Sequence, residues 1–255
     1  MAIANRRKVI VVGSIAVAAI VAATSPLWAP RLGRKIAWLE VDKVEIAGTR
    51  LLAPHEVLAA SGIRDGQHLL DDSGIWESSL LQNPVIASAR VTRKLPNTLR
   101  VTVQEKTPVA FVQDEMLKVV TSSGEVLPLD PAAVQVDLPI VRGSLTDSSS
   151  LVTTHRLLSE TDRLSSLDPA LMSEVSEVSA ASADGGTLRL VLPQGEVILT
   201  EGATPARTAQ LRAVLADVAR RLVSADGASA PPRVRLDLRF GDQIVVAPLS
   251  SPEIS

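Results

Sequence analysis

The residue types that most often carry enzyme chemistry are few and scattered in this sequence. His55 and Glu56 begin like the zinc-binding helix motif H-E-x-x-H, but position 59 is Ala where that motif requires its second His. The three histidines, His55, His68 and His155, fall in different predicted elements. The sequence therefore predicts no shared metal site.

Other signatures of catalysis are missing from the sequence as well. It has no cysteine, which excludes a thiol nucleophile, a zinc finger and a disulfide framework. It has no phosphate-binding G-x-x-x-x-G-K-[ST] motif and no G-x-S-x-G or S-x-x-K motif. The paired carboxylates of Asp71 and Asp72 are better explained as the start of a helix. We therefore expect a protein that is not an enzyme and that has no cofactor and no small-molecule substrate.

Composition and charge narrow the function classes further. The 255 residues could form one large domain or two of about 100 residues. Aromatic residues make up only 2% of the chain, which argues against nucleic-acid binding by base stacking. Residues 1–35 carry six Lys or Arg and no Asp or Glu, so the remainder has 20 basic and 28 acidic residues. An acidic main body also disfavours nucleic acid as a partner.

Residues 9–30 contain no charged side chain and follow the basic run Arg6, Arg7 and Lys8. About 20 apolar helical residues span the hydrocarbon layer of a bilayer, so this segment is long enough to cross it. A cleaved signal peptide shares the basic start and apolar middle, but no clean A-x-A site closes the segment. We expect a retained membrane anchor. The residues expected to contact lipid or its interface include Val9, Ile10, Ile15, Ile20 and Trp28.

After the anchor, the hydrophobic pattern predicts the order strand, helix, helix, strand, strand. The first strand contains Val44 and Ile46, a helix begins near Pro54, and a second helix begins near Asp72. A three-stranded sheet with both helices on one face would bury all the apolar sides. The side chains expected to face inward from the two helices are Val57, Leu58, Ile75, Leu80 and Leu81.

The last two strands of this unit form a hairpin within residues 84–110. Leu99, Val101 and Val103 alternate with polar residues, which places one set on a buried face and the other in water. Residues 95–98 supply the turn. Basic residues also gather on this hairpin, namely Arg90, Arg93 and Arg100. A solvated strand face explains them, and the alternative is a contact with an acidic partner or with lipid headgroups.

The second half of the chain alternates short strands with helices. A polar break is expected at residues 144–150, with a helix over 153–166 after it and a longer helix over 205–223. The last strand pair is expected at 234–240 and 244–246, and it is either ordinary core or an exposed edge that pairs with a partner strand. The other expected strands lie at 109–112, 116–120, 125–128, 137–140, 188–192 and 197–199.

Several short motifs, in order, resemble the FtsQ/DivIB family of bacterial division proteins. The closing stretch from Val234 through Asp237 to Phe240, followed by a strand and Ala247-Pro248, is similar to the last strands of that family. The earlier matches are Gly62-Ile63, Gly66, Leu69-Leu70, Pro84-Val85, Ala89-x-Val91-x-Arg93, Leu95-Pro96-x-Thr98-Leu99, Val101-x-Val103-x-Glu105 and Pro108-Val109-Ala110.

The resemblance implies an α+β protein with a single N-terminal transmembrane helix. A POTRA domain of order β-α-α-β-β would follow, and then a mixed, mainly antiparallel β domain with a long helix. The implied parts are a cytoplasmic tail at 1–8, the transmembrane helix at 9–30, the POTRA domain at 38–107, the FtsQ-type β domain at 108–248 and a polar tail at 249–255.

The resemblance also implies a non-enzymatic scaffold in the bacterial inner membrane, located at the division septum. Its N-terminus would be cytoplasmic and its body extracytoplasmic. Its partners would be FtsB-like and FtsL-like bitopic proteins, which act with the septal peptidoglycan synthase complex. An alternative is a POTRA-containing protein of a secretion or outer-membrane assembly system, and a membrane-tethered hydrolase would need a nucleophile and base that the sequence does not supply.

By the same resemblance, the closing strands are the partner-binding site, through addition of a partner strand. The residues expected there are Leu238, Phe240, Ile244, Val245 and Val246. A main-chain ladder tolerates many side chains but not a lost N–H group. Val245→Pro is therefore expected to weaken binding more than Val245→Thr.

Overall fold

The computed structural model describes residues 39–114, 116–132, 136–183, 186–225, 233–241 and 243–249. The chain divides into two compact units, Met1–Glu105 and Lys106–Ser255, which are treated separately below. The predicted membrane anchor at residues 9–30 lies outside the described residues. Across the described ranges, no helix combines the length and apolar character needed to cross a bilayer.

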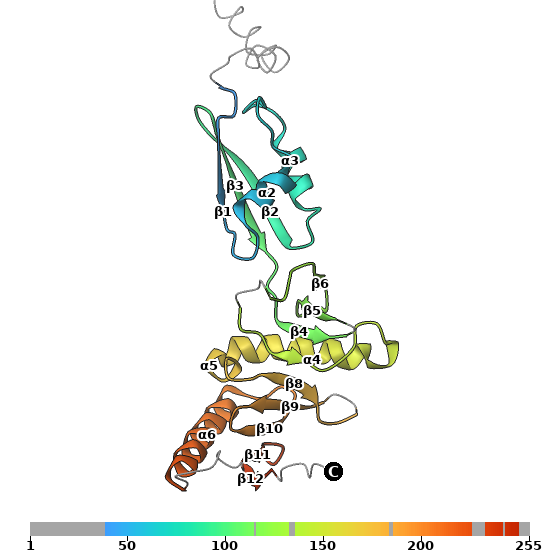
Figure 1. Cartoon of the computed structure of the whole chain (residues 1–255), viewed down its shortest axis with the longest axis vertical. Helices are drawn as coiled ribbons and strands as arrows, with labels where there is room; N and C mark the ends of the chain where they lie inside the picture. Colours follow the sequence, from blue (N-terminus) through green and yellow to red (C-terminus); the bar gives the residue numbers. More distant parts are fainter. Residues whose placement is uncertain are drawn as a thin grey trace, which may run out of the picture. The chain divides into compact units, whose positions relative to one another are not determined.

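The first unit has the predicted order of strands and helices (Figure 1). Its sheet has the order β1-β3-β2, in which β1 lies parallel to β3 and β2 lies antiparallel to β3. A POTRA-like β-α-α-β-β arrangement is thus confirmed for this unit. Its elements are β1 (Lys43–Ala47), α2 (Pro54–Ser61), α3 (Ser73–Leu80), β2 (Ile86–Lys94) and β3 (Thr98–Glu105).

Local signals in the sequence define both helices of the first unit. Pro54 occupies the first turn of α2, where its missing N–H group costs nothing, and Gly62 ends the helix with φ of 70°. Asp72 caps α3 by accepting a hydrogen bond from the Gly74 N–H group. Both helices pack on the sheet face that carries Leu99 and Val101.

The prediction of which helical side chains face inward was wrong in part. Leu58, Ile75 and Leu81 are exposed, whereas Trp76 and Leu80 are buried against the sheet. Each helix has only eight residues, so a narrow stripe at spacing i, i+4 is all that reaches the core. Trp76 and Leu80 occupy that stripe in α3.

Glu105, the last residue of β3, fastens the loop between β1 and α2. Its carboxylate accepts hydrogen bonds from the main-chain N–H groups of Arg50, Leu51 and Leu52 at 2.9, 2.7 and 2.9 Å. Hydrogen bonds to a charged acceptor are stronger than those to a neutral one. The Glu105 side chain therefore supplies the hydrogen-bond acceptors for three main-chain N–H groups of this loop.

The second unit is built on a nine-stranded sheet of order β12-β11-β10-β9-β8-β7-β4-β5-β6. Five of its eight strand pairs are antiparallel and three are parallel, so the expected mixed, mainly antiparallel sheet is confirmed. Its strands are β4 (Ala110–Gln113), β5 (Leu117–Val120), β6 (Val126–Leu127), β7 (Ile140–Val141), β8 (Glu177–Ala180), β9 (Thr187–Leu192), β10 (Gly195–Thr200), β11 (Val234–Asp237) and β12 (Val245–Pro248).

Two long helices connect parallel neighbours in this sheet, and both were predicted, at 153–166 and 205–223. α4 (Ser148–Leu167), followed by the short α5 (Pro169–Met172), joins β7 to β8, and α6 (Pro205–Ala225) joins β10 to β11. Parallel neighbours need such crossover connections. Leucines of α4 and α6 and of the central strands form one buried core.

Two boundaries in the second unit differ from expectation, and two short elements were not predicted. α4 begins at Ser148 inside the predicted polar break, because the Asp147 side chain accepts a hydrogen bond from the Ser149 N–H group and caps the helix. α5 and β8 were not predicted, since neither has enough residues for a clear periodicity. The strand expected at 234–240 ends at Asp237.

We predict that Glu105→Ala loosens the loop between β1 and α2. Removing the carboxylate leaves three N–H groups without their acceptor, and since the site is half-exposed we expect a cost of about 2–3 kcal/mol. Hydrogen exchange of the amides of residues 50–52 measures this directly. Gln104→Ala, an exposed neighbour on the same strand, is the control, and unchanged exchange at residues 50–52 in Glu105→Ala would contradict the assigned role.

Candidate functional site

β12 is the terminal strand of the nine-stranded sheet, and it pairs with β11 alone (Figure 1). Among the residues that the structure describes, one side of its main chain is therefore open. A free strand edge presents unpaired N–H and C=O groups that another chain can join. The opposite end of the sheet is β6, which has only two residues and offers a much shorter ladder.

The hydrogen bonds around β11 show which groups of β12 face the open side. The N–H groups of Val234 and Leu238 donate to β10, to Gln194 O and Ile198 O at 3.1 and 2.8 Å. On the other side of β11, the Leu249 N–H group donates to Arg233 O at 2.8 Å.

Because bonding alternates along an antiparallel pair, Val245 and Ala247 also direct their N–H and C=O groups toward β11. The main-chain groups of Val246 then point to the open side. Pro248 has the same orientation as Val246, and its lack of an N–H group costs nothing there. The free ladder is therefore centred on Val246.

The expected site residues divide into exposed and buried members. Phe240, Val245 and Val246 are 53%, 45% and 48% exposed, so a partner can reach their side chains. Ile244 is half-buried against the core. Leu238 is only 5% exposed and lies within the core, so its side chain supports the edge from behind and is not a surface contact in this structure.

Arg207, in the first turn of α6, holds the connection between β11 and β12. Its Nη2 atom donates to the carbonyl oxygens of Leu238, Phe240 and Gln243 at 3.0, 3.2 and 2.6 Å. Its Nη1 atom donates to Gln210 Oε1 at 3.0 Å, which holds the guanidinium in place. A single side chain thus fixes the turn that delivers the edge strand.

A second arginine shapes the surface at the end of β11. Arg239 makes an ion pair with Asp237, with Nη2 and Oδ2 at 2.6 Å, and its guanidinium lies 5.8 Å from the ring centroid of Phe240. The hydrogen bonds from Arg239 hold the pKa of Asp237 below its usual value. Phe240 therefore has a cation over one face of its ring.

Close contact between β10 and β11 requires glycine at the start of β10. Gly195 has φ of 149°, and a Cβ atom there would lie 1.8 Å from Val234 O. β11 can pair with β10 only because that side chain is missing, and β12 in turn pairs with β11. The position of the free edge thus depends on Gly195.

The geometry shows that Val245→Pro, the substitution expected to test this site, would not test partner binding alone. Since the Val245 N–H group faces β11, Val245→Pro would disrupt the internal pairing with Asp237 before it affected a partner. Val246 is the position whose N–H group is open. Sequence reasoning also missed Arg207, because its role arises from carbonyl groups more than 30 residues away.

The histidines do not come together in the structure. His55 belongs to α2, His155 to α4, and His68 lies in the loop before α3. Within the ranges that the structure describes, no group of three or more His, Cys, Asp or Glu side chains could hold a metal ion.

We predict that Arg207→Ala releases the turn at residues 238–243. Three carbonyl groups lose a charged donor, a cost of about 1–3 kcal/mol, so exchange of the hydrogen-bonded amides of Gln243 and Val245 should accelerate by about 5- to 160-fold. Arg220→Ala is the matched control on the same helix, because Arg220 donates to Ala216 O and Asp217 Oδ1 one turn away. Equal exchange in both variants would show that Arg207 does not hold the turn.

Comparison with known families covers most of the described chain. Residues 39–106 match the model described as "POTRA domain, FtsQ-type", and residues 110–239 match "Cell division protein FtsQ/DivIB, C-terminal". The first match covers the three-stranded unit. The second covers the nine-stranded sheet from β4 to the end of β11, and it includes Arg207 and Asp237.

Curated relatives carry the name "Cell division protein FtsQ". The protein of Anaeromyxobacter sp. (strain K) is 32% identical over 144 residues, which cover 54% of this chain and 49% of the relative. The protein of Syntrophotalea carbinolica is 28% identical over 156 residues, covering 59% and 55%. The protein of Myxococcus fulvus is 28% identical over 218 residues, covering 84% and 75%.

The chain thus spans about half the length of the first two of these relatives and three quarters of the third. The two family models together follow the order of the two units, with a POTRA domain first and the nine-stranded sheet second. The chain belongs to the FtsQ/DivIB family of bacterial cell division proteins.

Proposed function

We propose that this cell division protein is a non-enzymatic membrane scaffold that binds FtsB-like and FtsL-like bitopic proteins through the free edge of β12. The observation that carries the proposal is that β12 ends the sheet with Val246 open on its outer side. Strand addition to such an edge obtains affinity from main-chain hydrogen bonds and specificity from alternate side chains. Phe240, Val245 and Val246 supply exposed apolar contacts beside the ladder.

The scaffold is tethered to the inner membrane by residues 9–30, with residues 1–8 in the cytoplasm and the two units outside. The proposed domains are POTRA at 38–107 and the β domain at 108–248, with a polar tail at 249–255. Bound FtsB-like and FtsL-like chains connect the scaffold to the septal peptidoglycan synthase complex. The alternative role in secretion or outer-membrane assembly has less support, since both matching family models are of the FtsQ type.

We predict that Val246→Pro weakens capture of the FtsB-like partner by about 5- to 160-fold. The substitution removes an outward N–H group and leaves a partner carbonyl unpaired, which costs about 1–3 kcal/mol. Val246→Thr keeps the N–H group and should retain most of the affinity. Co-purification of the partner with each full-length variant, at matched folded level, measures the difference.

Two further variants separate edge pairing from simple unfolding. Pro248→Ala adds an outward N–H group and should bind at least as tightly as the parent chain. Val245→Pro breaks the native pairing with β11 and should expose the amides of Arg235 and Asp237, which face β12, to exchange, whereas Val246→Pro should leave them protected. Equal capture of the partner by Val246→Pro and Val246→Thr would contradict the strand-addition proposal.

We also predict that an N-terminal fluorescent fusion of the full chain gathers at the division site before constriction. The reason is that a scaffold which recruits the synthase has to arrive before new septal wall is made. Time-lapse imaging of cells in which the fusion replaces the native protein provides the measurement. An even membrane signal at every stage, from a fusion that supports division, would contradict a septal scaffold.

A further inference from the structure

The outer face of the POTRA sheet carries a concentrated positive charge. Helices α2 and α3 cover the face that contains Leu99 and Val101, so side chains at the alternate positions of the three strands point the other way. The register pairs Glu45 with Arg100 and Arg100 with Thr92, which places them on this outer face. The charged residues of the outer face are Lys43, Glu45, Arg90, Lys94 and Arg100.

The POTRA unit as a whole is not basic, so the positive charge of its outer face reflects an uneven distribution of charged residues within the unit. Between residues 39 and 105 there are seven Lys or Arg and nine Asp or Glu. Four of the seven basic residues lie on the outer face, but only one of the nine acidic residues does. The face has a formal charge of +3 within a unit whose formal charge is −2.

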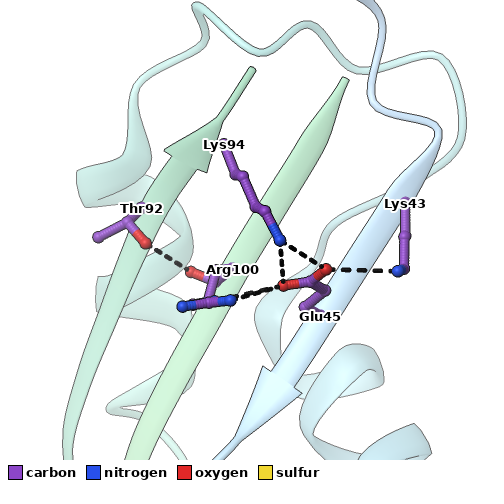
Figure 2. A network of polar contacts seen from close by, with 5 residues as sticks. All are labelled: Lys43, Glu45, Thr92, Lys94 and Arg100. Carbon is purple, nitrogen blue, oxygen red and sulfur yellow. Dashed lines mark hydrogen bonds and ion pairs between the residues drawn. The ribbon is translucent and has the colours of Figure 1, made fainter. Parts of the chain in front are cut away.

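The single carboxylate of the face lies at the centre of the cations (Figure 2). Glu45 is 3.3 Å from Lys43 Nζ, 3.2 Å from Lys94 Nζ and 3.0 Å from Arg100 Nη2. Its side chain is 24% exposed, whereas those of Lys43, Lys94 and Arg100 are 66%, 57% and 51% exposed. The carboxylate holds the cations together while their charged ends remain available to a ligand.

The carboxylate of Glu45 does not become protonated near neutral pH, so the net charge of the face does not change there. Hydrogen bonds from Arg100 first, and then from Lys94 and Lys43, lower the pKa of Glu45 to about 2. The carboxylate is therefore charged throughout the physiological range. Arg90 adds a cation on β2 for which the described part of the chain provides no ion-pair partner.

If residues 9–30 are the anchor, the length of the connection keeps the POTRA unit close to a membrane surface. The POTRA unit is already folded at Leu39, whose carbonyl oxygen accepts a hydrogen bond from the Leu69 N–H group. Only residues 31–38 separate the apolar segment from it, and eight residues reach at most about 25–30 Å. Arg31, Arg34 and Lys35 lie in that connection and would add to the same field.

We propose that the outer face of the POTRA sheet docks on anionic lipid headgroups of the bilayer that holds the anchor. Lysine and arginine near an anionic surface are attracted to it, and the attraction falls off within a Debye length. The sheet face is polar, and both helices of the unit lie on the opposite face, so docking would bury no apolar surface and would remain reversible. Its occupant is the phosphate-rich surface and not a single lipid molecule, because the cations form an open array.

The proposal depends on the membrane anchor of the proposed function but not on the β12 edge. Its test uses the full chain in nanodiscs made either of phosphatidylcholine alone or of phosphatidylcholine with phosphatidylglycerol. Since the chain has no cysteine, Thr102→Cys places one fluorophore at the centre of the face, and Ser78→Cys places one on exposed α3. Quenching by a nitroxide on the lipid headgroups reports how close each label comes to the bilayer.

The label at position 102 should be quenched more strongly than the label at 78, and only with phosphatidylglycerol present. The difference should disappear on raising the salt from about 0.1 M to 1 M, which shortens the Debye length from about 10 Å to 3 Å. Each cation contributes about fivefold to docking, so Lys94→Gln with Arg100→Gln should lower the docked-to-undocked ratio about 25-fold.

Two variants separate docking from a structural effect. Glu45→Gln removes the ion pairs but raises the positive charge of the face, so docking should increase about fivefold even if the fold loosens. Arg50→Gln with Arg64→Gln removes two cations elsewhere in the unit and should leave the quenching at position 102 nearly unchanged.

Equal quenching in both lipid compositions, or weaker docking in Glu45→Gln, would overturn the proposal. If added polyglutamate protected the label at position 102 from a soluble quencher and anionic nanodiscs did not, the lipid proposal would be overturned in favour of an acidic protein partner. A full chain that does not enter nanodiscs at all would refute the anchor and the docking together. Capture of the FtsB-like partner through β12 is a separate measurement, so either proposal can fail alone.

Discussion

The second unit depends on the main-chain pairing of three successive strands, β10 with β11 and β11 with β12. Each strand has two sides, and β11 uses one for β10 and the other for β12, so no group of β11 is left for a partner. The open side therefore falls on β12. Gly195 permits the first pairing and Arg207 holds the turn that makes the second possible.

This arrangement separates the stability of the edge from its binding chemistry. Leu236 and Leu238 are buried and attach the last strands to the core, while Val245 and Val246 remain exposed. Main-chain groups alternate between internal and external use, so neighbouring residues of β12 have different roles. A partner strand could thus join without breaking an existing hydrogen bond.

The two units also carry surfaces of different chemical character. The edge of β12 offers directional main-chain groups and apolar side chains, which suit a peptide strand. The outer face of the POTRA sheet offers three cations around one carboxylate and a fourth cation, Arg90, on β2, which suits a diffuse anionic surface because charge attraction needs no precise register.

The amino-acid sequence by itself determined the element order of the first unit, the hairpins and the long helix predicted at residues 205–223, since period-two and period-3.6 patterns and cap residues are local. It also identified the family, through motifs in order. Only the tertiary structure decided that Trp76 and not Ile75 is buried and that Arg207 holds a distant turn. It also decided that the main-chain N–H group of Val246, and not that of Val245, points to the open side of β12. Each of these depends on which segments lie side by side, and local spacing does not contain that information.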